Sequence, residues 1–418
     1  MKRYTDKSFY YSLLLSLALS VVMGAAVIFI LRGGLIQNVR QVSDKSRGLH
    51  RYVENDLDGD DVSDLMLVSN KESILKFRAH LLGGMDGVSG KGNGYSHRII
   101  ARTLSAAGIP VPGDYDGDGH IDLGAYDSGR PEREAKLGTW TIQLSGGFNK
   151  TYSPRCGGVD GRSCEFRWGS GEDRAVPADF DGDGITDPAV FAPSTGYWKI
   201  LYSSGGFDEA KAAVGEPTGG AMVQFGLAGD LPVVGDLDGD GKAEIVVVRG
   251  AKAANSGETS SDQTKLAWWI RSVAGTAIRD IPEKIYFGAL NSIPLIQDLD
   301  GDGKGEIVVY EPPTTPTYSG RWLVWTSKGE RVADAAPNEW GGVPVIADVD
   351  GDGKNDLGLF IEGIPAQALE GKWIFRYSSV RESLRRSVGD VPPVRGEFRF
   401  GVQGETPVTL ALRRHQQQ

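Results

Sequence analysis

The chain has few of the residues that usually build transition-metal or nucleophilic sites. Its 418 residues include two cysteines and five histidines, and no histidine is close to the cysteines in sequence. A zinc site needs about four such ligands, so zinc binding is not expected. The His-Glu-x-x-His, Gly-x-Ser-x-Gly and phosphate-binding glycine motifs are also absent. The sequence therefore predicts no enzyme activity and no nucleic-acid binding.

Long hydrophobic runs are also rare, and a single one is long enough to cross a membrane. Residues 9–31 carry no charge, and at about 1.5 Å per residue they span about 34 Å. Lys2, Arg3 and Lys7 precede this run, and basic residues favour the cytoplasmic side. We therefore predict a single-pass membrane protein with the bulk of the chain outside the cytoplasm, in the periplasm or at the cell surface. Its parts are a cytoplasmic segment (1–8), a transmembrane signal anchor (9–31) and a juxtamembrane linker (32–48).

A cleaved signal peptide is the alternative for this segment. Gly24, Ala25 and Ala26 offer small residues for cleavage, and the chain would then be secreted. The apolar core of a secretory signal usually has about 7–15 residues, whereas this run continues to Leu31. Its length favours an uncleaved anchor.

The two cysteines, Cys156 and Cys164, lie close together in a glycine-rich segment. An exported chain meets an oxidising environment, so we predict that they form a local disulfide. Such a small ring would add about 2–3 kcal/mol of stability. A pair of free thiols is the alternative.

Aspartate and glycine, by contrast, are abundant and are arranged in six copies of one acidic loop. The first to sixth acidic loops span residues 56–64, 114–122, 179–187, 236–244, 298–306 and 348–356. Each has carboxylates at positions 1, 3, 5 and 9 and glycine at position 4. Position 6 is also glycine, except that the first loop has Asp61, a residue type that tolerates a left-handed backbone. Regular recurrence of the loop along the chain indicates a repeat architecture.

The spacing within each loop suits a hard divalent cation, above all calcium, which prefers about six to eight oxygen ligands. In the fourth loop, Asp236, Asp238 and Asp240 would supply carboxylates and Lys242 its carbonyl oxygen. Glu244 would complete the shell with its carboxylate. The equivalent predicted ligands are Asp56, Asp58, Asp60, Val62, Asp64, Asp114, Asp116, Asp118, His120, Asp122, Asp179, Asp181, Asp183, Ile185, Asp187, Asp298, Asp300, Asp302, Lys304, Glu306, Asp348, Asp350, Asp352, Lys354 and Asp356.

These loops predict up to six structural calcium ions, with weaker binding in the first loop. Plain Asp-Gly turns without metal are the alternative. Six divalent ions would turn the formal charge of −10 slightly positive. The protein with calcium bound would then not repel an anionic glycan or membrane surface.

Short apolar segments flank the acidic loops. One precedes the loop, as in residues 231–235, and one follows it, as in residues 245–248. A third carries tryptophan, as in residues 268–270, and a fourth ends in an aromatic-glycine pair, as in Phe287-Gly288. Their β-branched content and their glycine and proline boundaries are typical of strands.

Four strands per repeat predict an all-β fold, a β-propeller of four-stranded antiparallel blades over residues 49–412, followed by a tail at 413–418. Six acidic loops predict six blades, with the tryptophans packed between them. Residues 400–412 begin the repeat again and stop before an acidic loop, so we expect them to close the ring with one strand. A seven-bladed ring with one degenerate blade is the alternative.

The segment 179–200, with its Asp-Phe-Asp-Gly-Asp-Gly-Ile-Thr-Asp loop and following Trp-Lys-Ile strand, resembles the FG-GAP/VCBS-type repeats of exported propeller proteins. The resemblance extends over roughly residues 49–412. Proteins of this type include integrin α-chain propellers, lectins and propellers attached to polysaccharide-degrading enzymes. The resemblance implies that calcium lies in the hairpin loop between the first and second strands of each blade.

The loops between the second and third strands should lie on the face opposite the calcium loops. The longest of these loops span residues 127–138, 249–265, 311–320 and 362–371. Extended loops on a rigid scaffold often bind ligands. We therefore predict a membrane-anchored binding or scaffold module for a protein or glycan partner, serving adhesion, surface recognition or envelope assembly. The alternative is a surface-acting polysaccharide- or lipid-degrading enzyme built on the propeller.

Overall fold

The computed structural model separates the chain into two compact units, Met1–Arg51 and Tyr52–Gln418. It describes residues 56–57, 62–71, 74–82, 98–104, 106, 108–128, 137–145, 163–205, 219–252, 264–278, 281–313, 320–326, 329–335, 342–363, 370–376 and 395–408. The predicted anchor, linker and C-terminal tail lie outside these residues and stay predictions. Among the described residues, no helix is long and apolar enough to cross a membrane.

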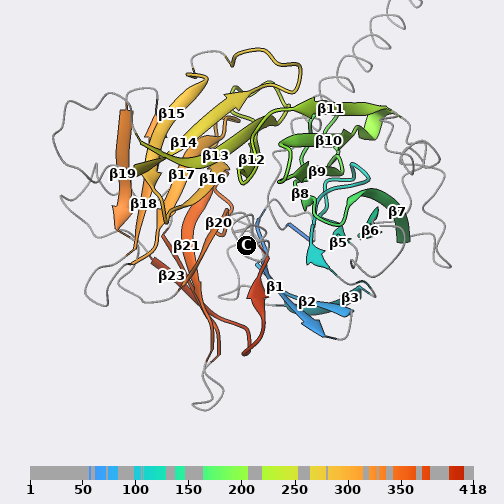
Figure 1. The fold of residues 1–418 in the computed structure, drawn as a ribbon. Coiled ribbons are helices and arrows are strands. Elements are labelled where there is room, and N and C mark those ends of the chain that lie inside the picture. Colours follow the sequence, from blue (N-terminus) through green and yellow to red (C-terminus); the bar gives the residue numbers. More distant parts are fainter. Residues whose placement is uncertain are drawn as a thin grey trace, which may run out of the picture. The chain divides into compact units, whose positions relative to one another are not determined.

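The described strands of the second unit form six four-stranded antiparallel sheets, the blades of a β-propeller (Figure 1). The first blade comprises β24 (Thr406–Pro407), β1 (Leu65–Lys71), β2 (Ile74–Leu81) and β3 (Arg98–Leu104). The second comprises β4 (Ile109–Pro110), β5 (Leu123–Asp127), β6 (Leu137–Gln143) and β7 (Ser163–Ser170), and the third β8 (Arg174–Ala175), β9 (Ala189–Ala192), β10 (Tyr197–Leu201) and β11 (Gly220–Gln224). The fourth comprises β12 (Leu231–Gly235), β13 (Glu244–Lys252), β14 (Thr264–Arg271) and β15 (Lys284–Ala289). The fifth comprises β16 (Ile293–Gln297), β17 (Glu306–Glu311), β18 (Arg321–Thr326) and β19 (Gly329–Ala335), and the sixth β20 (Val343–Ala347), β21 (Asp356–Ile361), β22 (Lys372–Arg376) and β23 (Arg395–Arg399).

This architecture confirms the predicted all-β, six-bladed fold over the seven-bladed alternative. The helical content of the described region is one 3-10 turn, η1 (Ser203–Gly205). The four apolar segments predicted for each repeat are the four strands. In the fourth blade, for example, Trp268 of β14 pairs with Val248 of β13 and Ile285 of β15.

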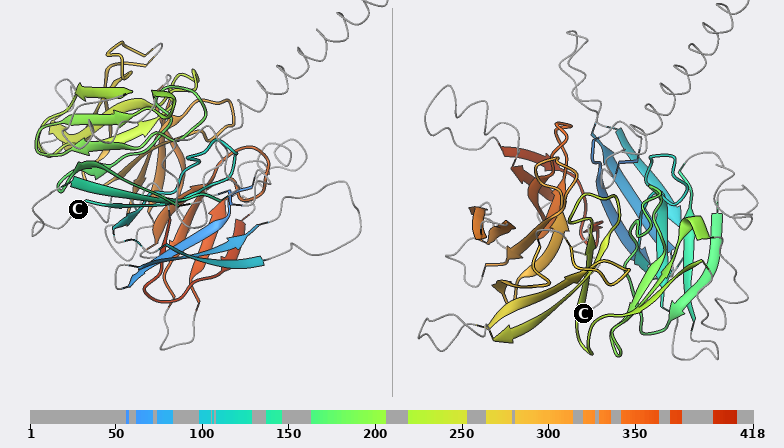
Figure 2. Two further views of the ribbon diagram at one scale, coloured as in Figure 1. Left: turned by 90° about the vertical axis from the view of Figure 1, so that its right-hand side faces the viewer. Right: turned by 90° about the horizontal axis from the view of Figure 1, so that it is seen from above.

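The blades are held together by hydrophobic clusters between neighbouring sheets. Within the described part of the chain there are six such clusters, one for each pair of adjacent blades. One cluster joins Leu65 and Leu67 of the first blade to Phe360 and Trp373 of the sixth. The strands of these two blades, which are far apart in sequence, lie side by side in Figure 2. Second strands such as β9 are buried along their whole length because blades cover both of their faces.

The repeated tryptophan and the repeated aromatic-glycine pair are joined by a hydrogen bond. Trp198 Nε1 donates to the Phe225 carbonyl at 2.7 Å, and Trp268 Nε1 donates to the Phe287 carbonyl at 3.0 Å. Trp140 and Trp373 make the equivalent bonds to Trp168 and Phe400. These four third-strand tryptophans are buried, which confirms their predicted packing role. A single side chain thus satisfies a buried carbonyl and fills the space between blades.

The ring is closed by the C-terminal strand β24, which takes the first position in the first blade. Thr406 pairs with Val68 of β1, and Pro407 pairs with Leu67. The predicted closing strand is therefore confirmed. The first blade was expected to begin near residue 49, but its first strand comes from the C-terminal end, and residues 49–55 lie outside the described region.

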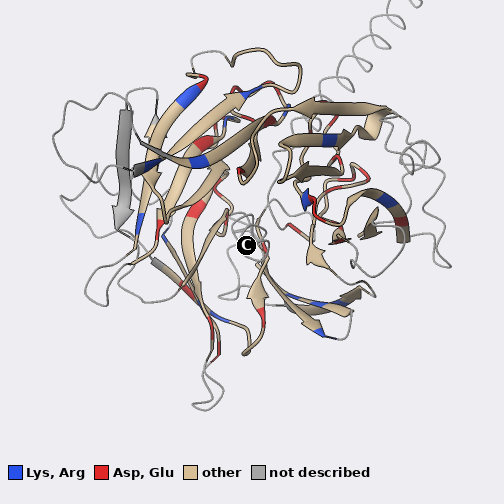
Figure 3. Cartoon of the chain, in the orientation of Figure 1, with Lys and Arg blue, Asp and Glu red and all other residues tan. Residues whose placement is uncertain are grey.

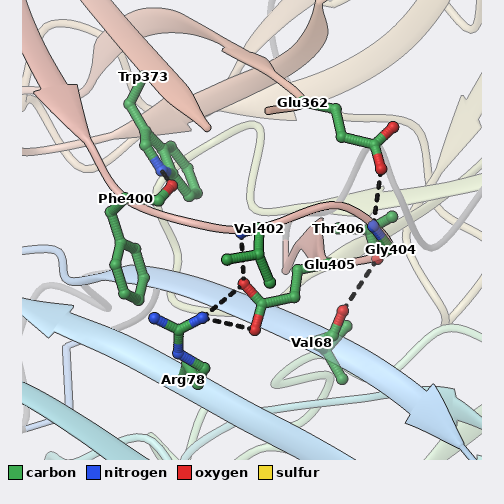
Figure 4. A network of polar contacts seen from close by, with 9 residues as sticks. All are labelled: Val68, Arg78, Glu362, Trp373, Phe400, Val402, Gly404, Glu405 and Thr406. Carbon is green, nitrogen blue, oxygen red and sulfur yellow. Dashed lines mark hydrogen bonds and ion pairs between the residues drawn. The ribbon is translucent and has the colours of Figure 1, made fainter. Parts of the chain in front are cut away.

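Polar contacts secure this closure (Figure 4). Arg78 of β2 forms an ion pair with Glu405, in which Nη1 donates to both carboxylate oxygens at 2.9 Å. Glu405 also accepts a hydrogen bond from the Val402 amide at 2.9 Å. The amide of Gly404 donates to Glu362 at 2.7 Å. The turn before β24 is thus tied to both the first and the sixth blade.

Candidate metal centre

Five of the acidic loops join the first strand of a blade to its second strand. They lie between β4 and β5, β8 and β9, β12 and β13, β16 and β17, and β20 and β21. The first loop precedes β1 directly. This is the placement implied by the resemblance, and it puts the loops at the same end of their blades. Figure 3 shows acidic segments in loops, while the strands are mostly uncharged.

The first carboxylate of the loop organises the backbone of its own turn. In the second loop, Asp114 Oδ1 accepts the Gly117 amide at 2.7 Å and Oδ2 accepts the Gly119 amide at 2.9 Å. The third to sixth loops repeat both bonds. Position 6 needs a left-handed backbone, as predicted, and Gly241 illustrates it with φ of +86°. The glycines and the first aspartate therefore shape the loop together.

The ninth carboxylate ties the loop to two other segments of its blade. Asp122 Oδ2 accepts the Tyr115 amide at 2.8 Å, and Oδ1 accepts the Ser145 amide, just after the third strand, at 2.6 Å. Asp187 repeats the pattern with the amides of Phe180 and Ser203. This residue is fully buried in both loops. It fixes the loop against the turn that leads to the fourth strand.

Carboxylates converge in five loops of the described region. In each loop, three acidic residues offer oxygen atoms that all lie within 4.8 Å of one another. Two oxygens on opposite sides of a calcium ion are separated by about 4.8 Å, because calcium–oxygen distances are about 2.3–2.6 Å. The groups are Asp114, Asp116 and Asp122; Asp179, Asp181 and Asp187; Asp236, Asp238 and Glu244; Asp298, Asp300 and Asp302; and Asp348, Asp350 and Asp356.

Position 3 carries the clearest sign that these residues fit a cation. Oδ2 of Asp116 and Oδ1 of Asp181 are buried and accept no hydrogen bond. A buried carboxylate oxygen without a donor is unfavourable unless a cation meets it. The all-oxygen donor set also suits calcium or magnesium rather than a softer metal. The residues therefore fit a hard divalent ion. They would hold it through positions 1, 3 and 9 in four of the five loops and through positions 1, 3 and 5 in the fifth acidic loop.

The electrostatics of the clusters support the same conclusion. Burial, which disfavours the charged form, raises the pKa of Asp122 and of Glu244 to about 8. Burial likewise raises the pKa of Asp187 and of Glu306 to about 7 and that of Asp116 to about 6. The neighbouring carboxylates raise each of these pKa values further. A divalent cation would remove this repulsion and restore the charged forms.

Positions 5 and 7 are arranged less uniformly. In the second to sixth loops the position-7 amide donates to a position-5 carboxylate oxygen at 2.9 Å. Asp302 is the position-5 residue that joins its cluster, whereas Asp118, Asp183, Asp240 and Asp352 lie outside theirs. Glu306, predicted at position 9, also lies outside its cluster and accepts the Leu299 amide. In the second loop, the His120 side chain also approaches a carboxylate, with Nδ1 3.5 Å from Asp118 Oδ2.

The first loop is described in part. Asp56, Val62 and Asp64 are buried, while Asp58 and Asp60 lie outside the described residues. Asp64 accepts the amides of Leu57 and Leu82, the same role that Asp122 has in the second loop. Its ninth position therefore follows the common plan, and its metal binding stays a prediction.

Two serines of η1, which the spacing of the acidic loop does not predict, reach the third loop. Ser203 Oγ donates to Asp183 Oδ2 and Ser204 Oγ donates to Asp181 Oδ2, both at 2.5 Å. The signal was present, because Ser145 and Ser203 both follow a third strand and precede a glycine pair. Comparison of the repeats at this turn would have found them. These hydroxyls orient two of the predicted ligands.

The cysteine and long-loop predictions fall largely outside the described residues. Cys164 is buried in β7, but Cys156 is not described, so the disulfide stays a prediction. The long loops between second and third strands are likewise mostly outside the described region.

Comparison with known families agrees with this repeat. Residues 179–247, which span the third and fourth acidic loops, match the FG-GAP-like repeat. No curated protein sequence matches the chain.

Proposed function

This chain is a six-bladed β-propeller that carries an FG-GAP-like repeat, and we propose that it is an extracytoplasmic binding module stabilised by calcium. One observation carries the proposal: the acidic loops lie together at one end of the blades and bond to each other. That end is therefore committed to the scaffold. The opposite end, which includes the turns between blades, is the surface that we assign to a partner.

The opposite end displays apolar side chains at equivalent turns. Leu227, Leu290 and Val402 are 57%, 51% and 51% exposed, and each follows shortly after an aromatic-glycine pair. These turns link the fourth strand of one blade to the first strand of the next. Apolar side chains held on a rigid ring suit an interaction surface. They favour a protein partner over a glycan.

We assign the calcium a structural role. Most of its proposed ligands are buried or half-buried acids whose repulsion a cation would relieve. When bound, the ion would neutralise these carboxylates and hold the loop to the rest of its blade. The position-9 carboxylates would contact the ion and also accept hydrogen bonds from the backbone of the loop.

The membrane anchor completes the proposal. Residues 9–31 would hold the propeller at a membrane with its blades outside the cytoplasm. A calcium-dependent module is suited to that side, because extracellular calcium sites bind at about 10⁻⁴–10⁻³ M.

The test is affinity purification of the full-length chain from native membranes in mild detergent. The wild type is compared with the triple variant Leu227→Asp, Leu290→Asp, Val402→Asp, and with Ile99→Asp, an equally exposed apolar residue on the outer strand β3. We expect a protein partner that the wild type and Ile99→Asp retain and the triple variant loses. A partner retained equally by all three would refute the assigned surface. Retention of glycan without protein would instead support a lectin-like role.

A further inference from the structure

The acidic loops are bonded to one another around the ring. The amide at position 8 of one loop donates to the position-1 carbonyl of the preceding loop. The bonds are Ile121 to Asp56 at 2.9 Å, Thr186 to Asp114 at 2.7 Å, Ala243 to Asp179 at 2.7 Å, and Gly305 to Asp236 at 2.6 Å. The same geometry recurs although position 8 has a different side chain each time. It is therefore a property of the loop backbone and not of one residue type.

The remaining two bonds close the circle. Ser63 of the first loop donates its amide to the Asp348 carbonyl of the sixth loop at 2.8 Å. The Asp348 amide returns a bond to Ser63 Oγ at 3.0 Å. Between the fifth and sixth loops, Asn355 Nδ2 donates to the Asp298 carbonyl at 2.6 Å. The six loops thus form one closed belt of hydrogen bonds, named the loop belt below.

Side-chain packing follows the same path. A Cβ added at Gly182, position 4 of the third loop, would lie 3.1 Å from Cγ of Lys242, position 7 of the fourth loop. At Gly239 the corresponding distance to Lys304 Cγ is 3.0 Å. The position-4 glycine is therefore required partly because the next loop packs against it. Neighbouring loops cannot move independently at these contacts.

We propose that the loop belt couples the six calcium sites, so that calcium in one loop raises the affinity of its neighbours. This inference rests on the calcium binding proposed above. Position 1 carries both a ligand carboxylate and the carbonyl that accepts the belt hydrogen bond. Position 8 of the next loop lies between two ligand positions, 7 and 9. Fixing position 1 of one loop therefore fixes the ligand segment of the next.

The expected coupling can be stated as a measured quantity. Coupled sites in proteins typically change each other's affinity by about 5–150-fold, and the effect is reciprocal. Six sites in a closed ring each have two neighbours, so binding should be steep. We expect a Hill coefficient of about 2 for calcium, against 1 for independent sites.

The test is a calcium titration of the full-length chain in mild detergent, by calorimetry after chelator treatment. Two variants remove a side-chain hydrogen bond between loops without removing a predicted ligand. Asn355→Ala removes the bond that joins the fifth and sixth loops, whereas Ser63→Ala removes the Oγ bond and keeps the backbone bond from Ser63 to Asp348. The matched control is Asn291→Ala, an exposed asparagine in the turn between β15 and β16. We expect both belt variants to bind as many ions as the wild type with a lower Hill coefficient, and the decrease should be larger for Asn355→Ala, because Ser63→Ala keeps the backbone bond to Asp348. Asn291→Ala should titrate like the wild type.

The outcomes separate this inference from the proposed function. Absence of calcium binding would overturn both. Calcium binding by the wild type with a Hill coefficient of 1 would overturn the coupling and leave the proposed function intact. If the wild-type titration is steep and neither belt variant changes its Hill coefficient, the loop belt does not transmit the coupling between sites. Tryptophan fluorescence of each variant shows whether it is folded, so that unfolding is not mistaken for a loss of coupling.

Discussion

One contact that closes the ring, the ion pair of Arg78 with Glu405, can be removed without touching an acidic loop. Glu405 is 6% exposed and accepts hydrogen bonds from the Arg78 guanidinium and the Val402 amide. The Arg78 guanidinium also lies 4.9 Å from the centroid of the Phe400 ring. Arg78→Met keeps an apolar stem over this ring but leaves the Glu405 charge buried with one donor. We predict that this substitution weakens the attachment of β24 to the first blade.

The size of the effect follows from burial. Removal of one partner from a buried ion pair costs about 3–5 kcal/mol. The Arg78 side chain is 31% exposed, and screening by solvent reduces the expected loss to about 2–3 kcal/mol. With an unfolding entropy of about 2.1 cal/mol/K per residue, a unit of about 350 residues should lose about 3–4 °C in melting temperature. The double variant Arg78→Met, Glu405→Gln removes the uncompensated charge and keeps an acceptor for Val402, so it should recover most of the loss.

The assay is thermal unfolding of the full-length chain at fixed calcium, followed by tryptophan fluorescence. Arg102→Met is the matched control, because Arg102 is exposed on β3. It should change the melting temperature by less than about 1 °C. If Arg78→Met and Arg102→Met melt together, the ion pair does not stabilise the closure. If the double variant is no better than Arg78→Met, the cost is not the buried charge.

Three further predictions concern the loops and blades. Because burial raises the pKa of Asp122 and Glu244 to about 8, the calcium-free folded protein holds protons that the unfolded chain releases above about pH 4. Its melting temperature should therefore fall between pH 5 and pH 8, and saturating calcium should flatten this slope. Gly241→Ala should cost about 1–2 kcal/mol, because φ is +86° while space for a methyl group is open. Trp198→Phe should lower the free energy of unfolding by about 1–3 kcal/mol, because the Phe225 carbonyl loses its hydrogen-bond donor. The loss should appear as a lower midpoint in urea unfolding.

Much of the fold could be predicted because its signals are local and repeated. The acidic loop fixes where the first strand ends and the second begins, and the tryptophan and aromatic-glycine pair mark the third and fourth strands. The hydrogen bond that joins Trp198 to Phe225 could not be predicted, since it depends on cross-strand register. The closing strand was predicted because the repeat begins again at residues 400–412, but its register, with Thr406 opposite Val68, was not, since the two strands are more than three hundred residues apart in sequence.

The sequence predicted which residues make up the candidate metal site, but not the separate structural role of each residue. Spacing alone made positions 1, 3, 5 and 9 equivalent as carboxylate ligands. The structure separates them: Asp122 is fully buried and braces two backbone segments, whereas Asp118 lies outside its cluster. Burial and partners from other strands decide these roles, and neither is encoded within nine consecutive residues. The contacts between loops were invisible for the same reason.

The burial of carboxylates in the loop belt bears on the compartment in which the propeller would be stable. The position-1 and position-9 carboxylates of the belt are buried or half-buried, and Asp348 is buried at a contact between neighbouring blades. A cation bound where the blades meet would relieve the repulsion between these acids, which otherwise repel one another or take up protons. Calcium sites of extracellular modules bind at about 10⁻⁴–10⁻³ M, well above the range of cytosolic sensors at about 10⁻⁷–10⁻⁵ M. A ring of this kind would be stabilised by mass action only after export, which links its calcium loops to the orientation proposed for its anchor.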